Sequence, residues 1–224
     1  LSSAQMVGLS ASQIGALTSA QVLAIETSDL KTLSGAQIGG ITTANIAAMS
    51  TGQIASLGST LTDDLSYAQV GALTTAQLAG MNRLSISAIE VGDIPALSST
   101  QVAALSTTQL NYLSASQFAA LTPAQLAGID SADFGSLNAT LIGALTGAQI
   151  GGLSTAQLVG FGATNFGRLT TTQLRSLSSA QMGALTSAQV QALSTDQLST
   201  LTVSAITAIE STNIAAIRPV DFLS

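Results

Sequence analysis

The stretch Leu185-Thr-Ser-Ala-Gln-Val-Gln-Ala192 is one complete copy of an eight-residue repeat, L-[ST]-x-A-Q-[ILV]-x-A, and this repeat decides the fold. Copies of similar regularity occur at Leu17–Ala24 and Leu73–Gly80. The copies follow one another in unbroken register, and 28 copies of eight residues account for all 224 residues. Self-similarity at a fixed short period is the signature of a repeat architecture. We therefore expect one continuous octapeptide-repeat solenoid over residues 1–224.

The composition lies far from that of an average soluble domain, in which about a quarter of the residues are charged. Here 7% of the residues are charged, 46% are hydrophobic, and the net charge is −6. The polar surface must therefore consist of Ser, Thr, Gln, Asn and Gly. Disordered chains combine few apolar residues with high net charge, so this composition predicts that the array folds.

Several classes of function are disfavoured by the same composition. Five basic residues are too few and too scattered to neutralise a nucleic-acid backbone, so we expect no nucleic-acid partner. Ser, Thr or Gln interrupts every apolar run before the roughly 18–20 residues that a membrane span needs, so we expect no membrane span. Without His or Cys, no Ser–His or Cys–His arrangement can form. We expect no enzyme, no catalytic residue and no cofactor.

The eight positions of the repeat differ in character, and we number them from the Leu. Position 1 is apolar in all 28 copies, and position 6 is apolar in every copy except the one containing Thr62. These two positions are the predicted core. Positions 4 and 8 are nearly always small, which lets neighbouring units approach closely. Positions 3 and 7 vary most, and we expect them to face outward.

Positions 2 and 5 predict the start of a helix in each copy. Ser or Thr at position 2 and Gln at position 5 have the spacing of a capping box, in which each side chain binds the backbone N–H of the other residue. Positions 1 and 6 then form the hydrophobic staple that often accompanies it. Pro123 falls at the first helical position, where proline is favoured.

A single helix cannot run through successive copies. Apolar residues spaced alternately by five and three would spiral around a continuous helix instead of keeping to one face. We therefore expect a break in every copy, leaving about one and a half to two helical turns of 3.6 residues each. Pro95 falls late in its copy, where it removes a backbone donor, and it predicts a shorter 3₁₀ turn. The predicted fold class is all-α, a solenoid of short capped helices.

A β-solenoid with about three repeats per coil is the alternative. An even repeat length and the frequent Ile, Val or Phe at position 6 favour strands. Positions 1 and 6 have opposite parity, however, and would face opposite sides of an unbroken strand. Ala, Gln and Leu also prefer helices. Helices are therefore the preferred interpretation, and the β-solenoid stays open.

Copies that depart from the repeat are the candidates for a site. Three of them place carboxylates three residues apart, and such pairs are weak candidates for binding Ca²⁺ with help from carbonyl oxygens. These residues are Glu26, Asp29, Glu90, Asp93, Asp130 and Asp133. Acidic side chains also stabilise helix N-termini, and we prefer that interpretation. We therefore expect no metal site. The copy with Asp63 and Asp64 is interpreted as a local irregularity.

The repeat phrase of Leu73–Gly80 and Leu185–Ala192 resembles the tandem octapeptide arrays of very large, adhesin-like bacterial secreted or surface proteins. The resemblance covers the whole chain and implies an extracellular or cell-surface scaffold, without functional residues to carry over. The leading hypothesis is a structural protein, a rod or the subunit of a self-assembling filament or sheath, whose partners are copies of itself. The alternative is a surface adhesin or binding module whose regular Ser/Thr/Gln face meets carbohydrate, such as cell-surface glycans, a solid surface or ice.

Overall fold

The computed structural model describes residues 3–214, which form short helices and no strand. The predicted all-α solenoid is therefore confirmed, and the β-solenoid alternative is wrong. The chain divides into two units, unit 1 (Leu1–Ala120) and unit 2 (Leu121–Ser224). Each unit is described by itself, and one continuous solenoid over residues 1–224 stays a prediction.

Each copy within the described residues contributes one helix of four to six residues, slightly shorter than predicted. The helices of unit 1 are α1 (Ser3–Val7), α2 (Ala11–Gly15), α3 (Ser19–Leu23), α4 (Thr27–Leu30), α5 (Gly35–Gly40), α6 (Thr43–Ala48), α7 (Thr51–Ser56), α8 (Gly58–Asp63), α9 (Tyr67–Gly71), α10 (Thr75–Gly80), α11 (Arg83–Ala88), the 3₁₀ helix η1 (Val91–Ala96), α12 (Ser99–Ala103), α13 (Thr107–Leu110) and α14 (Ala115–Ala120). The helices of unit 2 are α15 (Pro123–Leu126), α16 (Ser131–Gly135), α17 (Ala139–Ala144), α18 (Gly147–Gly152), α19 (Thr155–Gly160), α20 (Gly162–Phe166), α21 (Thr171–Leu174), α22 (Ser179–Gly183), α23 (Ser187–Gln191), α24 (Thr195–Ser199), α25 (Val203–Ala208) and α26 (Ser211–Ile214).

The predicted capping box starts most of these helices. In α10, the backbone N–H of Gln77 donates to Oγ1 of Thr74 at 3.2 Å, and the N–H of Thr74 donates to Oε1 of Gln77 at 2.7 Å. Pro123 is the first residue of α15, as predicted, and Pro95 lies inside a helix of the predicted 3₁₀ type, η1. With six residues, η1 is not shorter than the other helices, so the predicted shortening is wrong. Capping by positions 2 and 5 therefore sets where most of the helices begin.

Positions 1 and 6 form the predicted core. Position 6 is the more deeply buried of the two, and Ile38, Ile46 and Val70 are among the side chains that have no exposed surface. Position 5 is buried as well in most copies after the first turn of unit 1, which the repeat pattern alone does not predict. Every unit therefore contains a polar column beside its two apolar columns.

Within each unit, the buried glutamines of position 5 join a turn to the preceding turn. Nε2 of Gln77 donates to the carbonyl oxygens of Ile46 at 2.8 Å and Met49 at 2.7 Å. In unit 2, Gln181 bonds Ile150 and Leu153 in the same way. These bonds span 31 and 28 residues, and 28 residues equal three and a half repeats. We call this set of bonds the carboxamide ladder.

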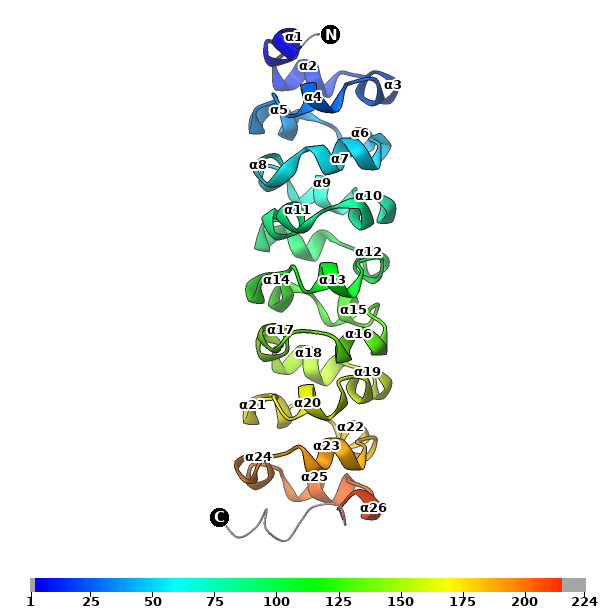
Figure 1. Ribbon diagram of the computed structural model, residues 1–224, viewed down its shortest axis with the longest axis vertical. Helices are drawn as coiled ribbons and strands as arrows, with labels where there is room; N and C mark the ends of the chain where they lie inside the picture. Colours follow the sequence, from blue (N-terminus) through cyan, green and yellow to red (C-terminus); the bar gives the residue numbers. More distant parts are fainter. Residues whose placement is uncertain (1–2, 215–224) are drawn as a thin grey trace. The chain divides into compact units, whose positions relative to one another are not determined.

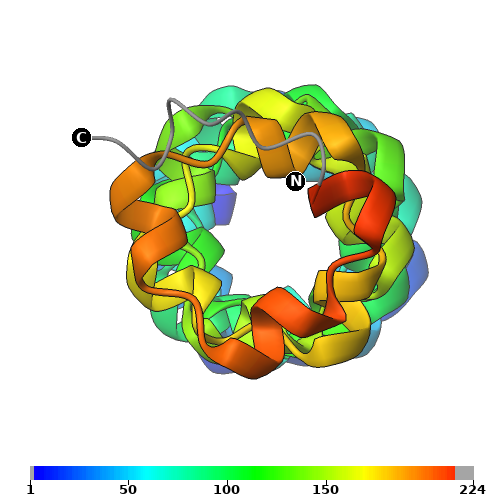
Figure 2. The ribbon, with the colours of Figure 1, turned by 90° about the horizontal axis from the view of Figure 1, so that it is seen from below.

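Helices three elements apart lie on one another within each unit. In unit 1, α2 contacts α5, α5 contacts α8 and α8 contacts α11, and these helices form a column in Figure 1. In unit 2, α16, α19, α22 and α25 are related in the same way. Figure 2 shows the orange and red helices of unit 2 following one another around a ring. The units are therefore coils of helices joined by the carboxamide ladder.

Close approach between turns depends on position 8, which lies over position 3 of a copy in the preceding turn. A Cβ atom added at Gly40 would collide with the carbonyl oxygen of Ala11, and one added at Gly152 would lie 2.9 Å from Cβ of Pro123. Where position 8 is larger, position 3 can be glycine, as in the pair Gly35 and Asp64. One member of each such pair must be small.

Two copies replace the capping residue with glycine in the left-handed conformation, at Gly58 (φ 66°) and Gly162 (φ 63°). The preceding residue, Leu57 or Phe161, is helical instead of extended. The ladder position that would face the carbonyl of Leu57 holds Ser85, which is fully buried and whose hydroxyl has no hydrogen-bond partner. At the copy that contains Gly58, the left-handed glycine therefore coincides with a missing bond of the ladder.

The adjacent glycines of α5 test the close approach of the turns. Gly40→Ala should destabilise unit 1 by about 1–3 kcal/mol or more, because the new methyl group collides with backbone of the preceding turn. Gly39→Ala, the matched control, should stabilise by about 0.5–1 kcal/mol, because nothing lies within 4 Å of its Cβ position. Thermal and urea unfolding followed by circular dichroism measure both. Equal effects of the two substitutions would refute the proposed contact.

A second pair of substitutions tests the carboxamide ladder. Gln77→Glu keeps an acceptor for the capping box but turns a side chain with 1% exposure into a carboxylate facing two carbonyl oxygens. We expect a loss of about 3 kcal/mol or more in unfolding free energy at pH 7, because the N–H of Thr74 still donates to one oxygen of the buried carboxylate, but the other oxygen would face two carbonyl oxygens without a donor. The carboxylate's pKa should be raised by this burial, so the loss should shrink in acid, where the side chain is neutral.

Gln13→Glu is the control for this substitution. Gln13 has the same capping box with Ser10, but it is exposed and makes no bond to another turn within the described residues. Because Glu serves in a capping box as Gln does, the control should change stability little. Urea unfolding at neutral and acid pH gives the comparison, and a Gln77→Glu variant as stable as the control would rule out a structural role for the ladder.

Candidate binding groove and acidic copies

The acidic copies place one carboxylate at the helix N-cap and one at position 5. Glu26, Glu90 and Asp130 are the N-caps of α4, η1 and α16, and none makes a side-chain capping bond. An acidic group at a helix N-terminus interacts favourably with the positive end of the helix dipole. This placement agrees with the preferred interpretation of these residues as helix-terminal charges.

Asp29, Asp93 and Asp133 stand at position 5, where other copies have the ladder glutamine. Within residues 3–214, no three acidic, histidine or cysteine side chains come together in a way that could hold a metal ion. Each copy therefore supplies at most a pair of carboxylates, whereas Ca²⁺ takes six to eight oxygen ligands. Binding of Ca²⁺ by these pairs stays a weak prediction from the sequence.

The pKa of Asp93 differs from that of a free aspartate, because the side chain is 9% exposed and lies near Glu90. Burial raises the pKa of the Asp93 carboxyl above its ordinary value of 3.8, and repulsion from Glu90 raises it further. The charged form is therefore disfavoured in the folded protein. A charged carboxylate at position 5 also cannot donate to the preceding turn as a glutamine does.

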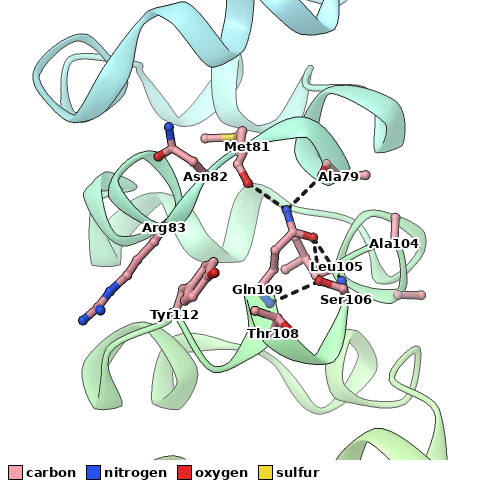
Figure 3. A pocket seen from close by; sticks show the side chains of 11 residues that line it. Ala79, Met81, Asn82, Arg83, Ala104, Leu105, Ser106, Thr108, Gln109 and Tyr112 are labelled. Carbon is pink, nitrogen blue, oxygen red and sulfur yellow. Dashed lines mark hydrogen bonds between the residues drawn. The ribbon is translucent and has the colours of Figure 1, made fainter.

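An open groove lies in unit 1 between the connection that precedes α11 and the connection that precedes α13 (Figure 3). The floor is Gln109, whose Nε2 donates to the carbonyl oxygens of Ala79 at 3.2 Å and Met81 at 3.0 Å. Oε1 of Gln109 accepts from the N–H of Ser106 at 3.1 Å. The ladder and the capping box therefore hold the floor in place.

Two large side chains at one end explain why the groove is open here. Tyr112 occupies position 8, which is Gly, Ala, Ser or Thr in nearly every other copy, and its counterpart at position 3 in the preceding turn is Arg83. Elsewhere one member of such a pair is small, as at Gly80 over Thr51. Arg83 and Tyr112 both line the groove, and Figure 3 shows the guanidinium of Arg83 directed away from Gln109. The two side chains separate instead of interlocking.

Several polar groups of the groove remain available. Arg83 is its only charged lining residue. Oδ1 of Asn82 accepts from the N–H of Ser85 at 3.1 Å, which leaves its amide nitrogen free to donate. Thr108 is exposed and Tyr112 is half-buried, and neither side chain has a hydrogen bond to any described residue. The groove thus combines one cation, one aromatic ring and two small polar groups.

Sequence reasoning missed both the ladder and the groove, although each left a signal. Position 5 holds Gln, Asn or Asp in 24 copies but never Glu, and all three glutamates of the chain occur at position 2. A capping box accepts Glu as readily as Gln, so the presence of Gln or Asn in 20 copies and of Glu in none indicates that a donor is favoured at this position. Tyr112 could have been noticed as the one aromatic residue at position 8.

Asp93→Asn tests the cost of the buried carboxylate. Because the folded pKa is raised, the carboxyl favours the folded state below its ordinary value of 3.8 and this contribution is lost as pH rises through the folded pKa. The amide variant should therefore melt at a higher temperature than the parent at pH 7, with the difference disappearing in strong acid. Asp196→Asn, at an exposed position, should change the melting temperature little. Calorimetry across pH decides, and a pH-independent gain would contradict this account.

Comparison with known proteins gives a family for the repeat. Among the described residues, no helix is long and apolar enough to cross a membrane. No curated protein matches the chain. A model of the ALTTAQ repeat matches residues 22–59, 86–123, 126–163 and 165–195, which together exceed half of the chain, and residues 72–77 spell the repeat's name. The chain belongs to the ALTTAQ repeat family.

Proposed function

We propose that this protein is structural and extracellular, a rod or the subunit of a self-assembling filament or sheath. The family and the all-α solenoid are those of a repeat-containing structural or binding protein. The carboxamide ladder is the observation that carries the finer proposal. Each turn presents glutamine donors along one edge and carbonyl acceptors along the other, so the two edges of a turn are complementary.

The first turn of unit 1 has donors of this kind that are not used. Gln13 and Gln21 are exposed, and their Oε1 atoms accept from the N–H groups of Ser10 and Thr18 at 2.8 Å. Their Nε2 atoms make no hydrogen bond within residues 3–214. A further turn of repeats, from the same chain or from a second copy, would supply acceptors for them. This edge supports assembly through the same bonds that join turns within a unit.

A cavity of about 410 Å³ lies beside the same edge. Its lining includes Met6, Leu17 and Ile25 together with Gln21. These residues belong to the apolar and carboxamide columns that a preceding turn covers elsewhere in unit 1. Burial of apolar side chains from a further turn would add hydrophobic stabilisation to the ladder bonds.

Low charge and the character of the repeat support the remaining parts of the proposal. A net charge of −6 over 224 residues gives little electrostatic repulsion between copies packed side by side. The extracellular location rests on the resemblance of the repeat to the octapeptide arrays of bacterial secreted and surface proteins.

Assembly should depend on concentration and on Gln21. We expect the sedimentation coefficient of the purified chain to rise with concentration, and regular filaments to be visible by electron microscopy at the highest concentrations. Gln21→Glu should reduce assembly at least about tenfold in apparent association constant, because a carboxylate cannot donate to a carbonyl oxygen.

The matched control is Gln191→Glu, which adds the same charge at an exposed position 7 of unit 2. It should assemble as the parent does. A parent chain that sediments as a monomer at every concentration would overturn the filament proposal, and equal effects of the two substitutions would show that the edge carrying Gln21 is not the contact.

A further inference from the structure

We propose that the groove of unit 1 shown in Figure 3 binds a sugar that carries a carboxylate, such as a uronic acid. This inference does not depend on the scaffold role, because it concerns the side of one unit rather than the edge of a turn. Its residues are Asn82, Arg83, Thr108 and Tyr112, around the floor formed by Gln109.

Arg83 selects for a carboxylate. Its side chain is exposed, and the guanidinium makes no ion pair or hydrogen bond with any residue that the structure describes. No acidic residue lines the groove, although acidic residues outnumber basic ones by 11 to 5 in the chain. A guanidinium presents two parallel N–H donors that match the two oxygens of a carboxylate. One isolated cation suits an ion of single charge better than a phosphate chain, which several cations normally neutralise.

Tyr112 supplies a surface for a sugar ring. Aromatic side chains combine a flat apolar face with, in tyrosine, a hydroxyl that both donates and accepts. A pyranose has a face of C–H groups that can lie on such a ring while its hydroxyls point outward. Because position 8 lies over position 3 of the preceding turn, the coil places the aromatic ring of Tyr112 and the cation of Arg83 at the same end of the groove.

Small polar groups and a fixed floor complete the groove. Nδ2 of Asn82 and Oγ1 of Thr108 are the donors and acceptors left for sugar hydroxyls, because Oδ1 of Asn82 is held by the N–H of Ser85. Gln109 has its carboxamide committed on both sides, with Nε2 on three carbonyl oxygens and Oε1 on Ser106. A floor that is already bonded does not have to be ordered when the ligand binds, which lowers the cost of binding.

Three small molecules separate the parts of the proposal. Sodium glucuronate, glucose and sodium acetate are titrated into the whole chain, and binding is followed by chemical-shift changes in NMR spectra at low salt. We expect glucuronate to bind about tenfold or more tightly than glucose, which lacks the carboxylate, and than acetate, which lacks the ring.

Variants locate the site. Arg83→Gln should reduce glucuronate affinity at least about tenfold, and Tyr112→Leu should reduce it several-fold, with unchanged circular dichroism. The matched controls are Arg175→Gln, at an exposed arginine of unit 2, and Tyr67→Leu, at a tyrosine of unit 1 that is 54% exposed and outside the groove. Both controls should bind glucuronate as the parent does.

Several results would overturn the inference. If glucose bound as tightly as glucuronate, Arg83 would have no role in selecting the ligand. If acetate bound as tightly as glucuronate, the groove would not recognise the sugar ring. No saturable binding of glucuronate, or equal losses in Arg83→Gln and Arg175→Gln, would remove the site altogether. Because Arg83 is exposed, its replacement leaves the fold intact, so the test does not rely on the half-buried Tyr112.

Discussion

One carboxamide with two ends holds this fold together. In each regular copy, the oxygen of the position-5 glutamine accepts from the backbone N–H at the start of its own helix, and the nitrogen donates to carbonyl oxygens of the preceding turn. Gln77 does both, with all its bonds between 2.7 and 3.2 Å. Helices as short as these are unstable alone in water. The capping bond shapes the helix, the ladder bonds secure it to its neighbour, and the same side chain must be in place for both.

Local features of the fold could be predicted from the sequence because they depend on residues within one copy. Capping residues, the apolar columns, the first-turn position of Pro123 and the 3₁₀ geometry around Pro95 all follow from spacings within a single repeat. The number of repeats in a turn could not be obtained in this way. It depends on how far apart the carbonyl groups of one turn and the amides of the next lie, which is a property of many copies together.

The groove was harder to foresee for the same reason. Tyr112 is unusual as the one aromatic residue at position 8, but Arg83 belongs to a copy 29 residues earlier, and the repeat pattern does not connect the two. Their meeting can be predicted only once position 8 is known to lie over position 3 of an earlier copy. The acidic copies are the opposite case: their pairs are obvious in the sequence, but Asp29, Asp93 and Asp133 occupy ladder positions and no third carboxylate joins any pair within the part of the chain described.

The bonds between turns span 28 to 31 residues, whereas the repeat is eight residues long. A ladder glutamine such as Gln77 therefore bonds the end of one copy, at Ile46, and the start of the next, at Met49, and any two consecutive regular copies offer the same pair of carbonyl groups. Any regular copy can therefore be gained or lost by recombination within the gene, and the remaining copies find equivalent partners in the new register. The irregular copies have no such freedom. Ser85 lies 28 residues after Leu57, the residue before Gly58, and loss of one octapeptide between them would bring the buried serine against a regular copy and put Asp93 in its place. Length variation among related genes should accordingly concentrate in the regular stretches and spare the segment from Gly58 to Ser85.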